Sequence, residues 1–145
     1  MLCRLLLASG FALVRPHFRL FSLVTAGRDE TAALREHIRF YLALFKALSR
    51  AGFVLHEPLV ELSDPTLQQE VFDPLAAEFP GVQFGCNPDR KEGAHSYSGV
   101  MLRICPMNQA GERHPIVDGG FTDWTARLLQ NRKACRRFMP SAQHA

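Results

Sequence analysis

Two segments of the chain combine glycines with polar side chains in a way that suits ligand binding. The first covers residues 92–104 and reads Glu-Gly-Ala-His-Ser-Tyr-Ser-Gly-Val-Met-Leu-Arg-Ile. Gly93 and Gly99 bracket a polar stretch that leads into an expected strand, and small residues there let a ligand approach the backbone. Tyr97 lies between these glycines, so its hydroxyl is a candidate partner for a ligand's amino or ring group; the alternative is a half-buried strand tyrosine.

The second segment covers residues 116–124 and reads Ile-Val-Asp-Gly-Gly-Phe-Thr-Asp-Trp. Gly119 and Gly120 are expected where a strand gives way to a helix, so that free backbone N–H groups could face an anion or a carboxylate. The alternative is that these glycines only serve a turn and that Asp123 caps the helix. If the two segments are the arms of one hairpin, we expect Tyr97 and the two glycines to converge on one concavity.

His95 and Arg103 complete the candidate residues of the two segments. His95 is a loop histidine that either contacts a ligand or is simply solvated. Arg103 points to the opposite side of its strand from Leu102, where it lines a cleft or meets water. The four cysteines, at positions 3, 86, 105 and 135, form no CxxC pair. This spacing predicts neither a zinc site nor a dense disulfide framework, and four loose thiols suit a reducing compartment.

The spacing of apolar residues predicts the elements that must position these side chains. We expect strands over residues 18–24, 82–84, 97–104 and 116–117, and helices over 29–52, 65–79 and 122–131. Residues 53–62 are expected to be extended, with Pro58 producing an edge strand or a bend. The order of these elements predicts an α+β fold, an antiparallel sheet with flanking helices, rather than a doubly wound parallel sheet.

The chain has 145 residues, which is enough for one ordinary domain. Residues 1–28 contain four arginines and no acid, so they are read as an N-terminal strand region, with an organelle-targeting segment as the alternative. Residues 29–132 form the expected core, and residues 133–145 lose all periodicity and are expected to be an irregular tail. These features predict a cytoplasmic protein, or an organellar one under the targeting alternative.

Charge and hydropathy narrow the classes of partner. The formal net charge is +3 and the arginines are scattered along the chain, which argues against nucleic-acid binding. No apolar run approaches the roughly 20 residues of a membrane-spanning helix. We therefore expect a small-molecule ligand, together with self-association or a partner subunit.

Together the two segments resemble the histidyl-tRNA synthetase-like branch of the class II aminoacyl-tRNA synthetases, over about residues 18–132. Within a motif of the form Arg-Gly-Leu-Asp-Tyr-Tyr-Thr-Gly and a later Gly-Gly-Arg-Tyr-Asp, the matching residues are Gly93, Tyr97, Gly99, Gly119, Gly120 and Asp123. Residues 18–21 also resemble the second strand of the family's motif 2, whose arginine lies near the ATP site. The resemblance thus implies a partial class II synthetase-like core, an amino-acid-binding site and a nucleotide contact by Arg19.

The sequence also departs from that family. Glu92 stands where the first motif has its arginine, and an acid there would repel both a carboxylate and the phosphates of ATP. His95 replaces the motif's aspartate, which is similar to the non-catalytic paralogue, the regulatory subunit of ATP phosphoribosyltransferase. Motif 1 and the glycine-rich motif 3 have no counterpart, so one edge of the sheet is expected to be open and to promote self-association.

The resemblance and its departures imply a degenerate domain that binds an amino acid or a related small ligand without catalysis. One alternative is an ATP-dependent amino-acid ligase that forms an aminoacyl adenylate with ATP and Mg²⁺ and takes an arginine from outside the motif. The other is a truncated fragment of a longer protein without independent function.

Overall fold

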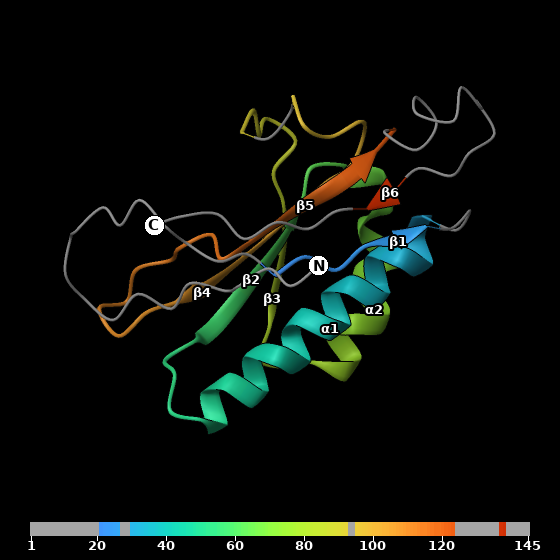
Figure 1. The fold of residues 1–145 in the computed structure, drawn as a ribbon. Coiled ribbons are helices and arrows are strands. Elements are labelled where there is room, and N and C mark those ends of the chain that lie inside the picture. The colour runs from blue at the N-terminus through green and yellow to red at the C-terminus, as the bar shows by residue number, and fades with distance from the viewer. Residues whose placement is uncertain (1–20, 27–29, 93–94, 124–136, 139–145) are drawn as a thin grey trace.

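The computed structural model describes residues 21–26, 30–92, 95–123 and 137–138. Figure 1 shows a sheet with helices packed against it. In chain order the elements are β1 (Thr25–Ala26), α1 (Glu30–Arg50), β2 (His56–Leu62), a 3₁₀ turn (Pro65–Leu67), α2 (Gln68–Glu78), β3 (Gln83–Cys86), β4 (Met101–Met107), β5 (Val117–Thr122) and β6 (Arg137–Phe138).

The strands form one mixed sheet in the order β1-β6-β5-β4-β2-β3. The two-residue strands β1 and β6 extend one end of it, and β3 forms the other edge. All neighbours are antiparallel except β2 and β3, which are parallel. A parallel pair needs a crossover connection, and α2 supplies it. The expected α+β fold with a mainly antiparallel sheet is thus confirmed, while the parallel pair at its edge was not predicted.

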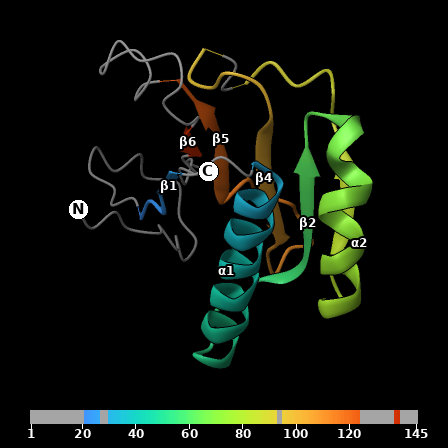
Figure 2. The same cartoon turned by 90° about the vertical axis from the view of Figure 1, so that its right-hand side faces the viewer.

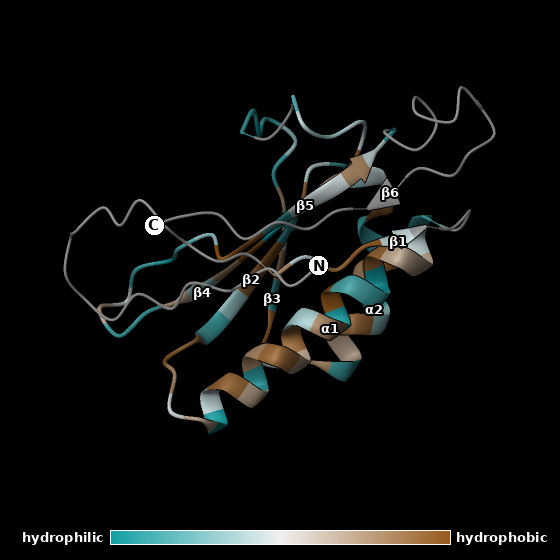
Figure 3. Cartoon of the chain, viewed as in Figure 1, coloured by the Kyte–Doolittle hydropathy of each residue, from teal (hydrophilic) through white to brown (hydrophobic). Residues whose placement is uncertain are grey.

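Helix α1 is amphipathic, and its apolar stripe forms much of the core. Leu34, Ile38, Tyr41, Leu42 and Phe45 are all buried, at the helical spacing that the sequence shows. In Figure 3 hydrophobic and hydrophilic positions alternate along this helix. Gly52 follows the helix with a φ of +93°, a left-handed conformation that glycine adopts without a Cβ penalty. The helix predicted over residues 29–52 is confirmed.

Helix α2 packs beside α1 and carries a proline in its interior. Asp64 caps the preceding 3₁₀ turn by accepting hydrogen bonds from the Thr66 backbone N–H and hydroxyl, at 2.8 and 2.7 Å. Pro74 lies inside α2 and cannot donate to the carbonyl four residues earlier, that of Glu70. The Arg35 side chain of α1 donates to this carbonyl from Nη1 at 3.2 Å. An arginine from the neighbouring helix therefore replaces the backbone donor that the proline removes.

Pro58 coincides with an irregularity in β2. The pairing of β2 with β4 shifts its register between His56 and Leu59, and Glu57, next to the proline, has a φ of 40°. Arg113 Nη1 donates to the Glu57 carbonyl at 2.6 Å. Beyond this irregularity β2 pairs with strands on both sides, so the predicted bend is confirmed and the predicted edge position is wrong.

The two faces of the sheet differ in character. Figures 1 and 2 show α1 and α2 on the same side of the sheet. Side chains that alternate along the strands meet these helices, and the buried ones are Val60, Leu62, Leu102, Ile104, Val117 and Phe121. Because successive strand side chains point to opposite faces, Glu61, Arg103 and Asp118 belong to the other face. We call this second face, which carries no described helix, the polar face.

Several expected elements differ from the structure, among them the return strand expected over residues 116–117, which spans Val117–Thr122. Of the strand expected over residues 18–24, only 21–24 are described, and they are not in a strand; β1 begins at Thr25. The strand expected over 97–104 lies instead over Met101–Met107, because the chain bends at Ser98 and Gly99 before entering it. Thr122, expected to begin a helix, is the last residue of β5, and residues 124–131 lie outside the described residues. No described helix is long and apolar enough to cross a membrane.

Candidate functional site

The two glycine-containing segments run side by side in the structure. The second enters β5, which pairs antiparallel with β4 in a register that places Met101 opposite Gly120 and Arg103 opposite Asp118. Tyr97 precedes β4, and its neighbour Ser98 donates its backbone N–H to the Phe121 carbonyl at 2.7 Å. The expected hairpin between the two segments is thus confirmed.

Gly119 and Gly120 lie inside β5 rather than at a strand-to-helix turn. Gly119 is opposite Leu102 and Gly120 is opposite Met101, and both residues are buried. The prediction that these glycines form an anion-binding turn at the start of a helix is therefore wrong. It failed because two adjacent glycines are typical of a turn, whereas here the strand continues through them to Thr122.

Tyr97 lies directly on Gly120. A Cβ atom built on Gly120 would stand 2.5 Å from Tyr97 Cγ and 2.7 Å from its Cδ1, closer than carbon atoms approach each other. The aromatic ring thus occupies the space that any other residue at this position would need. Tyr97 and Gly120 do converge, as expected, but the ring fills the space above Gly120, and Gly119 alternates to the other face.

Beneath Tyr97 lies a buried ion pair that the sequence did not reveal. Arg90 Nη2 donates to Asp118 Oδ1, and Arg90 Nη1 donates to the Leu102 carbonyl at 3.2 Å. The Tyr97 hydroxyl donates to Asp118 Oδ2 at 3.2 Å. The side chains of Arg90 and Asp118 are only 2% and 1% exposed. Burial raises the pKa of the Asp118 carboxyl, and the Arg90 guanidinium opposes that rise.

Only one partner of this ion pair could have been found from the pairing of the strands. Asp118 shares strand parity with Gly120, and Arg103 is its cross-strand partner. Arg90, in contrast, comes from the turn after β3, 28 residues away in sequence. The hairpin register would have identified Asp118, but no local pattern identifies Arg90.

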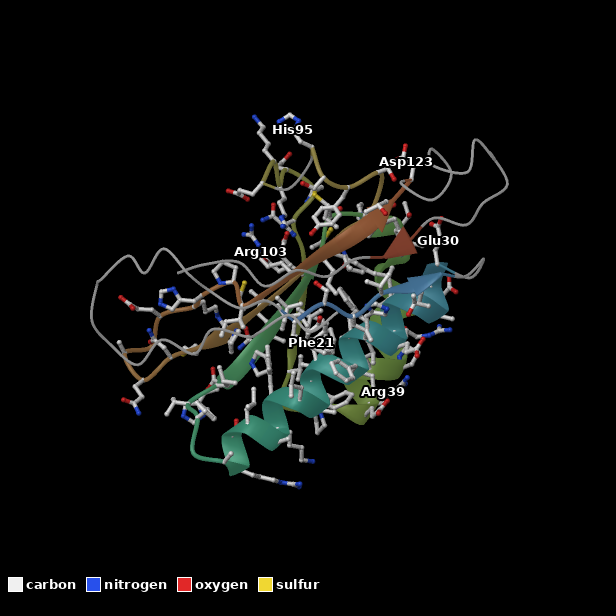
Figure 4. The ribbon with its side chains drawn as sticks, in the orientation of Figure 1. Phe21, Glu30, Arg39, His95, Arg103 and Asp123 are labelled. Carbon is white, nitrogen blue, oxygen red and sulfur yellow. The ribbon has the colours of Figure 1, made fainter. Side chains whose placement is uncertain are left out.

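Arg103 and Glu92 form a second ion pair nearer to solvent. Arg103 Nη2 donates to Glu92 Oε2 at 3.1 Å, and the two side chains are 17% and 70% exposed. Figure 4 labels Arg103, whose side chain extends from β4. Glu92, on the segment between β3 and β4, is therefore paired with an arginine of β4.

Charges of opposite sign alternate across three strands of the polar face. Glu61 of β2 is opposite Arg103 of β4, which is opposite Asp118 of β5. We call these three residues the charged row. Two charges of the row also affect Cys105 of β4. Burial raises the pKa of this thiol to about 11, the charge of Glu61 adds to the rise, and the charge of Arg103 opposes it. The thiol is therefore protonated at neutral pH and is not an activated nucleophile.

The remaining candidates are not gathered at the charged row. His95 is exposed on the loop before Tyr97, and Figure 4 shows both His95 and Asp123 away from Arg103. Gly99 has a φ of +109° and serves the bend before β4. Arg19 and Gly93 lie outside the described residues. Within the described parts of the chain, no group of three or more His, Cys, Asp or Glu residues could hold a metal ion.

The sequence was compared with protein-family models and with curated proteins. No protein-family model matches the sequence, and no curated protein is significantly similar to it. The resemblance to the histidyl-tRNA synthetase-like branch therefore depends on the residues of the two glycine-containing segments.

Proposed function

We propose that this chain binds an amino acid or a closely related zwitterion on the polar face, at the charged row, and does not activate it with ATP. The observation that carries the proposal is the fixed alternation of Glu61, Arg103 and Asp118 across three paired strands. The resemblance of the flanking segments to an amino-acid-binding motif supports the same class of ligand.

The chemistry of the row suits a small zwitterion. A guanidinium donates paired hydrogen bonds to a carboxylate, and a carboxylate accepts hydrogen bonds from an ammonium group. Residues directly opposite each other on neighbouring strands have Cβ atoms about 4.5–5.5 Å apart. Arg103 and Glu61 therefore offer a donor and an acceptor on adjacent strands of one face, and we propose that the ligand's carboxylate binds Arg103 with its ammonium group toward Glu61.

The local charge balance disfavours ATP. Three acids, Glu61, Glu92 and Asp118, lie at this site with Arg90 and Arg103, and the charge of Arg113 also reaches Cys105 of the same face. Arg90 is bound to Asp118, and Arg103 is bound to Glu92. A triphosphate would have to displace a carboxylate from a guanidinium that is already paired, whereas an ammonium group would be attracted to the acids. We therefore propose a binding or regulatory role, in a homo-oligomer or with a partner subunit, rather than adenylate formation.

The test is a titration of the chain with each of the twenty standard amino acids, in which binding is measured by calorimetry or by NMR. We expect at least one amino acid to bind to the wild type and to lose most of its affinity in Arg103→Gln. The matched control is Arg39→Gln, which removes an exposed arginine that pairs with Glu78 between the helices and should leave binding unchanged.

Two results would overturn the proposal. Binding of no amino acid, or equal binding by the wild type and Arg103→Gln, would exclude the charged row as the ligand site. Amino-acid-dependent exchange of pyrophosphate into ATP, well above background, would favour the ligase alternative and refute the non-catalytic role.

A further inference from the structure

The two partners of the Arg103–Glu92 ion pair differ in how firmly they are held. Arg103 lies in the middle of β4, with strand neighbours on both sides, and its side chain is 17% exposed. Glu92 lies on the irregular segment between β3 and β4, and its side chain is 70% exposed. An exposed ion pair of this kind contributes little to stability because water competes for both groups. Arg103 is therefore the fixed partner and Glu92 the replaceable one.

Arg103 also has hydrogen-bonding capacity that Glu92 does not use. Glu92 accepts a hydrogen bond from Nη2 alone, and Arg103 Nε is buried and has no hydrogen-bond partner among the described residues. A free carboxylate can approach a guanidinium side-on and accept from Nε and Nη2 together. A ligand carboxylate that displaces Glu92 from Nη2 and also reaches the buried Nε would make two contacts where Glu92 makes one.

We infer that the Glu92 carboxylate occupies Arg103 as a built-in competitor of the ligand's carboxylate, so that binding requires Glu92 to leave. This inference rests on the proposed function, because it assumes that the ligand binds at Arg103. A tethered competitor lowers the apparent affinity by the fraction of molecules in which Arg103 is free. It also selects against ligands whose anionic group cannot displace a carboxylate.

The displaced Glu92 remains close to the bound ligand. Its negative charge then attracts the ligand's ammonium group, which favours a zwitterion over a simple carboxylic acid. Removing the acid while keeping the shape of the side chain changes both the competition for Arg103 and the attraction for the ammonium group, and probes with and without a carboxylate separate these two effects. Glu92→Gln frees Arg103 for a carboxylate and removes an attraction for an ammonium group.

The experiment compares the affinities of the wild type, Glu92→Gln and Glu78→Gln for two probes. One probe is the tightest-binding amino acid of the panel, and the other is its carboxamide, which keeps the ammonium group and lacks the carboxylate. Glu78→Gln is the matched control because it also breaks an exposed Arg–Glu pair, the one with Arg39, and changes the net charge equally. Thermal unfolding checks that all three proteins are folded.

We expect Glu92→Gln to bind the amino acid about two- to five-fold more tightly than the wild type, the factor by which an exposed ion pair can hold Arg103. Its affinity for the carboxamide should be unchanged or weaker, and Glu78→Gln should match the wild type for both probes. Equal or weaker binding of the amino acid by Glu92→Gln would refute the inference while leaving the proposed function intact. Absence of amino-acid binding in both the wild type and Glu92→Gln would refute the proposed function and this inference with it.

Discussion

At the scale of single residues, burial rather than sequence neighbourhood decides what each polar side chain does. Arg90 and Asp118 are nearly inaccessible to water and bind each other. Arg90 also donates to the Leu102 carbonyl, and Asp118 also accepts from the Tyr97 hydroxyl. Replacing a buried ion pair is often harmless, but removing one partner leaves an uncompensated charge. The pair therefore fixes the position of Tyr97 over β5, next to the charged row.

Gly120→Ala should destabilise the fold by about 1–3 kcal/mol, because the new methyl group would overlap the Tyr97 ring. The cost falls on stability because the Tyr97 ring fills the concavity that the sequence predicts at Gly120. Urea denaturation of Gly120→Ala, Tyr97→Ala and the double variant forms a cycle that measures the contact. If the clash is the cause, Gly120→Ala costs less in the Tyr97→Ala background; additive effects would contradict it.

His37 should make stability depend on pH. Its side chain is fully buried on α1, with Nε2 2.8 Å from Thr25 Oγ1 of β1, and burial lowers its pKa to about 4. The folded protein therefore holds the neutral ring, while the unfolded chain takes up a proton below about pH 6.5. Stability should be complete above that pH and should fall progressively toward pH 4, by up to about 3 kcal/mol.

Urea unfolding at pH 7.5, 6.5 and 5.5 measures this dependence. His37→Gln has no titrating ring, so its stability should vary less over the same range. Equal pH dependence in the wild type and His37→Gln would show that other groups are responsible. His114→Gln is the control: it also removes a histidine, but His114 is only half-buried, in the loop between β4 and β5. Its stability should depend on pH as that of the wild type does.

At the scale of elements, two arginines one helical turn apart link α1 to α2 at the edge of their shared apolar core. Arg35 donates to the Glu70 carbonyl, and Arg39 Nε donates to both carboxylate oxygens of Glu78, at 2.9 and 2.8 Å. The Arg39–Glu78 pair is exposed and is worth at most about 1 kcal/mol. The Arg35 contact matters more, because it satisfies a carbonyl that Pro74 leaves without its helical donor.

Arg35→Met should therefore cost about 1 kcal/mol in the wild type and less in a Pro74→Ala background, where the backbone N–H of residue 74 serves the Glu70 carbonyl. Pro74→Ala alone should stabilise α2, because it restores this backbone hydrogen bond. Chemical denaturation of the two single variants and the double variant gives the coupling energy. An equal cost of Arg35→Met in both backgrounds would rule out this compensation.

At the scale of the whole molecule, the sheet ends in strands with an unpaired side. β3 pairs only with β2, and β1 pairs only with β6, among the described strands. Val24, Phe40 and Phe53 are the large hydrophobic side chains that are exposed in the described part of the chain. Unpaired strand edges and exposed apolar residues both promote association.

We therefore expect the isolated chain to self-associate. Sedimentation velocity over a hundred-fold range of concentration should show a sedimentation coefficient that rises with concentration. A single monomeric species at all concentrations would contradict the expectation.

The sequence alone determined the parts of the fold that depend on local interactions. The 3.6-residue spacing of α1, the Asp64-Pro65 start before α2 and the hairpin of β4 and β5 were all predictable. Helical periodicity, capping and short connections are encoded within a few residues, so a single sequence displays them. The candidate residues Tyr97, Glu92, Arg103 and Gly120 also came from the sequence, because two short segments contain them.

The tertiary structure alone decided the parts that depend on pairing between distant residues. The parallel pairing of β2 with β3, the position of Gly119 and Gly120 inside β5, and the partnership of Arg90 with Asp118 all follow from strand register. The sequence does not distinguish a glycine pair in a turn from one in a strand, whereas the structure shows the Tyr97 ring packed on Gly120. Register and long-range packing place the charged row on one face, because they join segments that have no local pattern in common.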